Sequence, residues 1–185
     1  MKRLLVSLTA LFAVLTMVVA SRSQEYPAGI IYGPKAAFQI TAPQGWVLNN
    51  EAGKRQGLDC VLYLQGFSWS DSPAIMYAKI ASPNFADAEA FASWAIKKME
   101  TEGSTFTHQR VEAGKTTGLH RYFVNEYRDR SASQFERVVY VQLPHAVAYI
   151  VYVARTEKAF NEHQKALPEV LHSFSYIPQF IDTGK

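Results

Sequence analysis

The stretch AVAYIVYVA, residues 146–154, constrains the fold more than any other segment of this chain. Small, branched and aromatic residues follow one another in it, and none of them is charged. A strand that is apolar on both faces belongs inside a sheet that other layers cover on both sides. We therefore expect a layered domain with this strand near its centre.

Strand and helix patterns alternate in blocks along the rest of the chain. Strand-like segments are expected at 29–34, 36–43, 46–48, 58–66, 72–82, 106–114, 120–129, 135–143 and 146–155. Between the fifth and sixth of these, the apolar residues of segment 85–103 recur three and four apart, which predicts a helix capped by Asn84 or Asp87 and ended by Gly103. Segment 156–176 is also predicted to be helical, with Pro168 starting a second short turn. This order predicts an α+β domain, in which helices flank a central antiparallel sheet.

The first 20 residues have the composition of an export signal. Lys2 and Arg3 precede an apolar run that ends in small residues at Val18 and Ala20, which predicts a signal peptide cleaved after Ala20. The alternative is a membrane anchor, because the run is near the lower length limit for a span. We expect a signal peptide (1–20), a short leader (21–28), one domain (29–178) and a C-terminal tail (179–185) in a periplasmic or secreted protein.

The charge of the expected mature chain is close to neutral. Residues 1–20 carry two of the 19 Lys and Arg and none of the 16 Asp and Glu, so the mature chain has a charge of 17 − 16 = +1. Nucleic-acid binding needs clustered positive charge, and no such cluster is visible, so we expect no nucleic-acid partner. After cleavage of the signal we also expect no integral membrane segment.

The single cysteine, Cys60, cannot form a disulfide within this chain. It shares one strand face with Leu62 and Leu64, so we interpret it as a small buried hydrophobic residue. A redox role, or a disulfide to another chain, is the alternative.

Local motifs for catalysis are missing from the sequence. The segment around Ser68 and Ser70 lacks the second glycine of a G-x-S-x-G turn, and GKTTG at 114–118 lacks the context of a phosphate-binding loop. The five histidines show no metal-binding spacing. We therefore predict no catalytic residue, no metal site and no cofactor, and interpret GKTTG as a hairpin turn.

The loop GFSWSDSP, residues 66–73, is the local feature that most favours a function. It connects two strands, and such connections lie on the surface, yet it carries Phe67 and Trp69. Exposed aromatic side chains beside a charge are typical of a partner-binding patch, which makes Phe67, Trp69 and Asp71 the candidate contact residues. Alternatively, the two rings fold back as a lid on the core.

The order of these segments resembles the PsbP-like superfamily, which includes PsbP of photosystem II, the Ran-binding Mog protein of yeast and exported bacterial proteins of unknown role. The markers are Pro43-x-Gly45-Trp46 and Ser173-Phe174, and the resemblance covers about residues 28–178. It implies an α/β/α sandwich used for binding or assembly, without established catalysis. It also implies that Trp46 closes one end of the core, and a bacterial envelope protein is the better match within the superfamily.

Three functional hypotheses follow. The first is an exported, non-enzymatic PsbP-like domain that binds a protein or envelope partner through Phe67, Trp69 and Asp71. The second is a small periplasmic hydrolase with a histidine and carboxylate site, since His120 and Glu126 share one strand face. The third is an envelope stress or structural protein.

Overall fold

A computed structural model describes residues 28–82, 84–85, 87–129 and 134–178 of the chain. The predicted signal peptide (1–20), residues 21–27 of the predicted leader and the predicted tail (179–185) lie outside the described residues. Ala28, the last residue of the predicted leader, is the first residue of strand β1.

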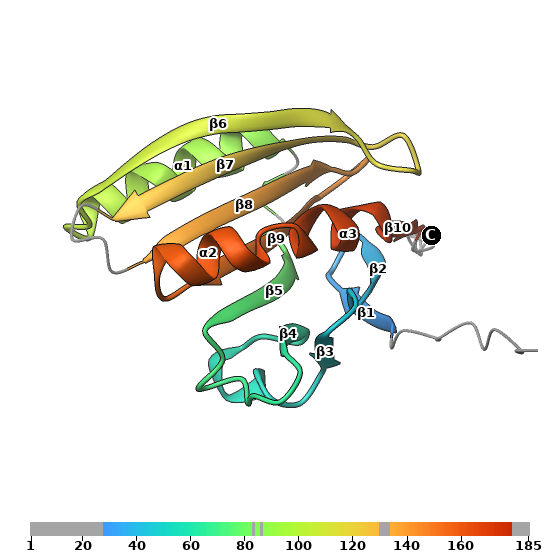
Figure 1. The fold of residues 1–185 in the computed structure, drawn as a ribbon. Helices are drawn as coiled ribbons and strands as arrows, with labels where there is room; N and C mark the ends of the chain where they lie inside the picture. The colour runs from blue at the N-terminus through green and yellow to red at the C-terminus, as the bar shows by residue number, and fades with distance from the viewer. Residues whose placement is uncertain (1–27, 83, 86, 130–133, 179–185) are drawn as a thin grey trace, which may run out of the picture.

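A seven-stranded sheet forms the centre of the structure (Figure 1). Its strand order is β3-β4-β5-β9-β8-β7-β6, and every neighbouring pair is antiparallel. The strand bounds are β3 Trp46–Asn49, β4 Val61–Leu64, β5 Ala74–Ile80, β6 Phe106–Lys115, β7 Arg121–Asp129, β8 Phe135–Gln142 and β9 Val147–Ala154. The apolar stretch of residues 146–154 thus forms β9, the middle strand, as predicted.

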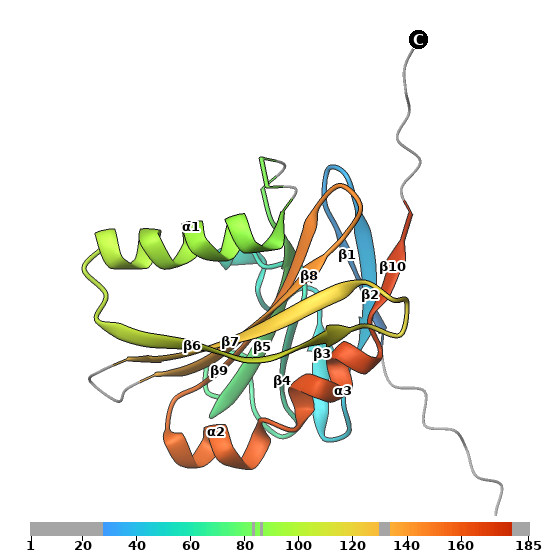
Figure 2. The same ribbon diagram turned by 90° about the horizontal axis from the view of Figure 1, so that it is seen from above.

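A second, three-stranded antiparallel sheet has the order β1-β2-β10. Its strands are β1 Ala28–Tyr32, β2 Ala37–Thr41 and β10 Ser175–Ile177. The last strand corrects the prediction that residues 156–176 are helical throughout, because the helical segment ends at His172 and the chain then pairs with β2. This pairing brings the last described strand beside one of the first (Figure 2).

Helix α1 (Ala88–Thr101) has the ends that the sequence predicts. The Asp87 side chain accepts a hydrogen bond from the Ala90 amide at 2.7 Å, which satisfies one of the free amides of the first turn. Gly103 follows with φ of 84°, a left-handed conformation that glycine adopts without steric cost. Within the described residues, no helix is both long and apolar enough to cross a membrane.

Helices α2 (Glu157–His163) and α3 (Ala166–His172) form the predicted pair of short helices. Thr156 caps α2 by accepting a hydrogen bond from the Ala159 amide at 3.1 Å. Pro168 lies in the first turn of α3, where a missing amide donor leaves no helical hydrogen bond unmade. A short 3₁₀ helix, η1 (Lys54–Gln56), lies between β3 and β4.

The core lies on both faces of the large sheet. Helix α1 covers one face, and α2 and α3 lie on the other (Figure 2). On one face, Phe91 of α1 packs against Tyr140 and Tyr149 of the sheet. On the other face, a mixed layer of α2, α3 and the small sheet encloses the larger cluster, which includes Phe38 and Phe174. The α+β class with an antiparallel sheet is confirmed, whereas a plain α/β/α sandwich is not, because strands make up part of the second layer.

Trp46 is 8% exposed and belongs to the larger core cluster, so it closes one end of the core as predicted. Its ring meets His163 of α2 edge-on, with 6.4 Å between the ring centroids. The turn before it depends on Gly45, which has φ of 78°.

Candidate functional site

The loop of residues 66–73, called the aromatic loop below, connects β4 to β5. Phe67 is 49% exposed, and Trp69 is partly exposed. The indole nitrogen of Trp69 donates a hydrogen bond to Gln56 Oε1 of η1 at 2.6 Å. The two rings therefore differ: Trp69 is held against a neighbouring segment, and Phe67 projects its ring toward solvent.

Polar groups fix the backbone of the aromatic loop. The Asp71 carboxylate accepts hydrogen bonds from the amide and the hydroxyl of Ser68, at 2.5 and 2.7 Å. These bonds hold the pKa of Asp71 below its ordinary value, so the side chain stays ionised at neutral pH. The loop therefore keeps its shape through its own hydrogen bonds, without burial of Phe67.

The ends of the aromatic loop are tied to the sheet. The buried hydroxyl of Ser72 accepts a hydrogen bond from the Leu64 amide at 3.2 Å and donates one to the Ala74 carbonyl at 2.5 Å. Arg155 directly follows β9, and its guanidinium donates a hydrogen bond to the carbonyl oxygen of Ser70. The three candidate residues thus have different roles. Phe67 is exposed, Trp69 is hydrogen-bonded to Gln56, and Asp71 stabilises the turn through its hydrogen bonds to Ser68.

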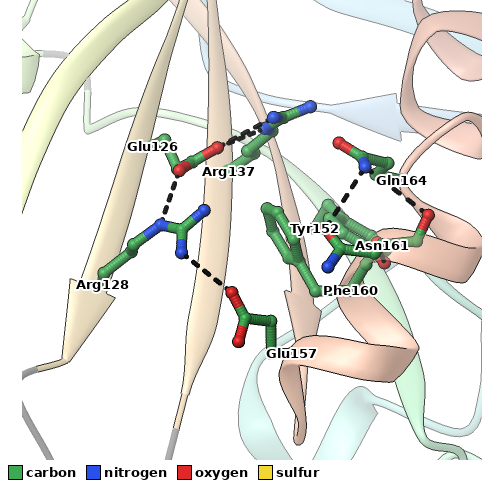
Figure 3. A network of polar contacts seen from close by, with 8 residues as sticks. All are labelled: Glu126, Arg128, Arg137, Tyr152, Glu157, Phe160, Asn161 and Gln164. Atoms are coloured by element: carbon green, nitrogen blue, oxygen red, sulfur yellow. Dashed lines mark hydrogen bonds and ion pairs between the residues drawn. The ribbon is translucent and has the colours of Figure 1, made fainter. Parts of the chain in front are cut away.

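Glu126, a candidate of the hydrolase hypothesis, lies in a network of ion pairs (Figure 3). It is 4% exposed, and its carboxylate accepts hydrogen bonds from Arg128 at 2.8 Å and from two nitrogens of Arg137 at 2.8 and 2.9 Å. Arg128 also reaches Glu157 of α2 at 3.3 Å. The network joins β7, β8 and α2, which gives Glu126 a structural role.

The pKa of Glu126 reflects this network. Burial acts to raise the pKa, but hydrogen bonds from Arg128 and Arg137 outweigh burial and hold the pKa below its ordinary value. A carboxylate that stays charged between two guanidinium groups is a poor proton acceptor at neutral pH.

His120, the other hydrolase candidate, lies far from Glu126. It precedes β7, and its ring meets Tyr176 edge-on at a centroid distance of 5.1 Å. Glu126 follows six positions later in the chain, a distance of about 20 Å along an extended strand. The structure therefore does not bring the two side chains into one site. Among the described residues, no group of three or more His, Cys, Asp or Glu side chains is arranged to hold a metal ion.

Cys60 is fully buried beside β4, which confirms its interpretation as a small hydrophobic residue. Burial, with a smaller contribution from the charge of Asp59, raises the pKa of the Cys60 thiol to about 12. The thiolate is the reactive form of cysteine, so this side chain is inert in the folded protein.

We expect a thiol reagent such as iodoacetamide to leave Cys60 unmodified in the native protein at pH 8. Modification should appear only as the chain unfolds, because folding both buries and protonates the thiol. Mass spectrometry along a urea titration measures this, with the modified fraction rising together with the unfolded fraction. Rapid and complete modification without denaturant would contradict the burial of Cys60.

Sequence reasoning missed Glu136, which lies on the α1 side of the sheet in β8. In the antiparallel register it lies opposite Tyr127 of β7 and Val153 of β9. Gln134 and Glu136 line two cavities, of about 390 and 360 Å³. The sequence does contain a pattern that indicates Glu136. In the strand segment FERVVYVQ, alternation places Glu136 on the same face as Val138 and Tyr140. A carboxylate beside Val138 and Tyr140 on one strand face indicates a candidate site, because a charge is costly to bury there.

The comparisons with known proteins identify relatives by structure alone. No protein-family model matches the sequence, and no curated protein matches it. Among solved structures, LpqN of Mycobacterium tuberculosis, involved in cell envelope biogenesis, is 12% identical with a TM-score of 0.52, covering 85% of this chain and 94% of that one. PA94 of Pseudomonas aeruginosa, a protein of unknown function described as a putative regulator, is 15% identical with a TM-score of 0.51, covering 82% and 99%.

A third matched structure is PsbP of the cyanobacterium Synechocystis sp. PCC 6803, which is 13% identical with a TM-score of 0.48, covering 76% of this chain and 86% of that one. The matches to LpqN and PA94 show that these two proteins share the overall fold of this chain. Identities of 12 and 15% carry no residue's role from one protein to another.

Proposed function

We propose that this chain is an exported, non-enzymatic binding domain that contacts a protein partner through the aromatic loop. The proposal includes the predicted division into a signal peptide (1–20), leader (21–28), domain (29–178) and tail (179–185), and a periplasmic or secreted location. An envelope role is also the one named for LpqN, which shares the fold.

The observation that carries the proposal is the exposure of Phe67 on a loop of fixed shape. Its side chain is 49% exposed, although Asp71, Ser72 and Arg155 each hold the surrounding backbone by hydrogen bonds. Exposing a large aromatic side chain forgoes part of about 1.5–3 kcal/mol of burial. A partner that covers the ring recovers this energy, and it loses little entropy because the loop is already ordered.

The surroundings of Phe67 favour a protein as the partner. Partly exposed Trp69 extends the apolar area, while Asp71 and Gln56 supply polar groups near its edge. An aromatic centre with a polar rim is the usual composition of a protein interface. The hydrolase hypothesis gains no such support, since His120 and Glu126 lie apart.

The test is affinity capture of the mature protein from its own envelope fraction, with Phe67→Ser and Trp69→Ser compared to the wild type. We expect the partner to be lost in Phe67→Ser, while the free energy of unfolding stays within about 1 kcal/mol of wild type. Tyr32→Ser is the matched control, since Tyr32 is 66% exposed on β1 of the other sheet. Retention of every partner by Phe67→Ser would reject the proposal and favour a structural or stress role.

A further inference from the structure

The cavity beside the C-terminal end of α1 has a chemically unusual lining. It measures about 390 Å³, and its lining includes the Met99 side chain and the rings of Phe106 and Tyr127. The two ring centroids lie 5.8 Å apart. The lining also includes Asp129 and Glu136, and Glu136 lies opposite Tyr127 in the sheet. The cavity therefore combines aromatic side chains with negative charge.

Glu136 is partly buried in the lining of this cavity. Its carboxylate has one hydrogen bond, from the uncharged amide of Gln134 at 3.3 Å, and within the described part of the chain no Lys or Arg pairs with it. Burial of a carboxylate that lacks a cation costs free energy. Glu126 shows the contrast, because two arginines neutralise its buried carboxylate.

Among the described residues, no neighbouring side chain pairs a positive charge with Glu136. Desolvation is the main cause that raises the pKa of Glu136 to about 7, which the Gln134 hydrogen bond opposes only in part. The described titratable and charged groups on the surrounding elements include Tyr127 and Asp129 of β7, Tyr77 of β5, Tyr140 of β8, Tyr149 of β9, His108 and Arg110 of β6, Lys98 and Glu102 at the end of α1, and Arg155 after β9. Arg110 is paired with Glu89 of α1, and Lys98 is paired with Glu102. The Arg155 guanidinium is hydrogen-bonded to the carbonyl of Ser70 in the aromatic loop.

We propose that this cavity binds a small molecule that carries an ammonium group, with the cation against Glu136 and its apolar part along Phe106 and Tyr127. The ligand supplies the positive charge that the partly buried carboxylate lacks, and aromatic faces attract ammonium groups. An anion would be repelled by the ionised carboxylate of Glu136. A hard metal ion prefers several oxygen ligands, and among the described residues no group of three or more His, Cys, Asp or Glu side chains is arranged to hold one.

The experiment uses isothermal titration calorimetry of the mature protein with cadaverine and choline, which represent primary and quaternary ammonium groups. The probes 1-pentanol and pentanoate are neutral and anionic counterparts of similar length. We expect both cations to bind, and both counterparts to bind at least tenfold more weakly. Equal binding of 1-pentanol would overturn the proposal, because it would show an apolar cavity without charge recognition. Binding of Ca²⁺ that depends on Glu136, without binding of either amine, would also overturn the proposal.

Two variants and one control variant locate the site. Glu136→Gln keeps the side-chain volume and should weaken cadaverine binding at least tenfold. Glu162→Gln is the matched control, because this substitution removes the same charge from an exposed position on α2. Loss of affinity in both variants would indicate attraction by net charge alone and overturn the proposal. Phe106→Leu should weaken choline binding several-fold, since it removes a ring and keeps an apolar side chain.

The pH dependence distinguishes a site at Glu136 from other acidic sites. With a pKa of about 7 in the free protein, the ionised fraction of Glu136 rises roughly tenfold between pH 6 and pH 8. Cadaverine affinity should rise by about the same factor in the wild type and in His108→Gln. A pH dependence that persists in Glu136→Gln would overturn the assignment. This inference is independent of the aromatic loop, so partner capture and amine binding can fail separately.

Discussion

Replacing Phe160 with alanine is expected to lower the free energy of unfolding by about 3–5 kcal/mol. Phe160 is 1% exposed and is the main anchor of the short helix α2. Its ring lies 5.8 Å from that of Phe135 and 5.4 Å from that of Tyr152, and the Arg137 guanidinium lies 5.1 Å from its centroid. Alanine would leave a cavity under α2 and uncover one side of the ion-pair network (Figure 3).

Urea denaturation followed by circular dichroism measures this effect, with Phe67→Ala as the matched control. The same chemical change at Phe67 should cost less than about 1 kcal/mol, because that side chain is half exposed and its loop is held by polar groups. A loss of 3 kcal/mol is a large share of the total stability of a domain of this size. Equal costs at the two positions would contradict the assignment of Phe160 to the core and Phe67 to the surface.

Glu136→Gln is expected to stabilise the fold above pH 7. The pKa of Glu136 rises from 4.5 to about 7 on folding, so between these values the native state binds more protons than the unfolded state. The stability of the wild type therefore falls as pH rises from about 4.5 to about 7, and then stays level with respect to this group. The full shift corresponds to about 3 kcal/mol, which glutamine should recover at pH 8 and not at pH 4.

Glu126→Gln should behave in the opposite way. The pKa of Glu126 is held below 4.5, so its ionised form stabilises the fold above that value, and this contribution is lost as pH falls through the lower pKa of the native state. Thermal denaturation of both variants from pH 4 to pH 8 measures the two trends. Destabilisation by Glu136→Gln at pH 8 would contradict an unpaired carboxylate at this position.

Much of the fold was predictable because its signals are local. The apolar run of residues 146–154 predicts β9 and its central place, and the period of residues 85–103 predicts α1 with its Asp87 cap. Strand β10 was not predictable, since Ser175–Ile177 is only three residues long and directly follows a helix. Its strand conformation depends on pairing with β2, a contact between distant parts of the chain.

The candidate site was predictable only in part, for a similar reason. Loop composition indicated Phe67, Trp69 and Asp71, but the bond from Trp69 to Gln56 depends on how η1 packs. Strand parity correctly allows His120 and Glu126 on one face, but parity says nothing about separation along the strand. The contact from Arg137 to Glu126 depends on the cross-strand register of β7 and β8, which residue type alone does not specify.

Photo-crosslinking from position 67 tests the central claim most directly. A photoreactive p-benzoyl-phenylalanine replaces Phe67 in one variant and Tyr32 in another, so that both probes lie at exposed positions of the intact protein. We predict a discrete crosslinked product from position 67 that is absent from position 32 and is reduced by Asp71→Ala, which removes the hydrogen bonds that shape the loop. No product from position 67, or the same products from both positions, would contradict a binding role for the aromatic loop.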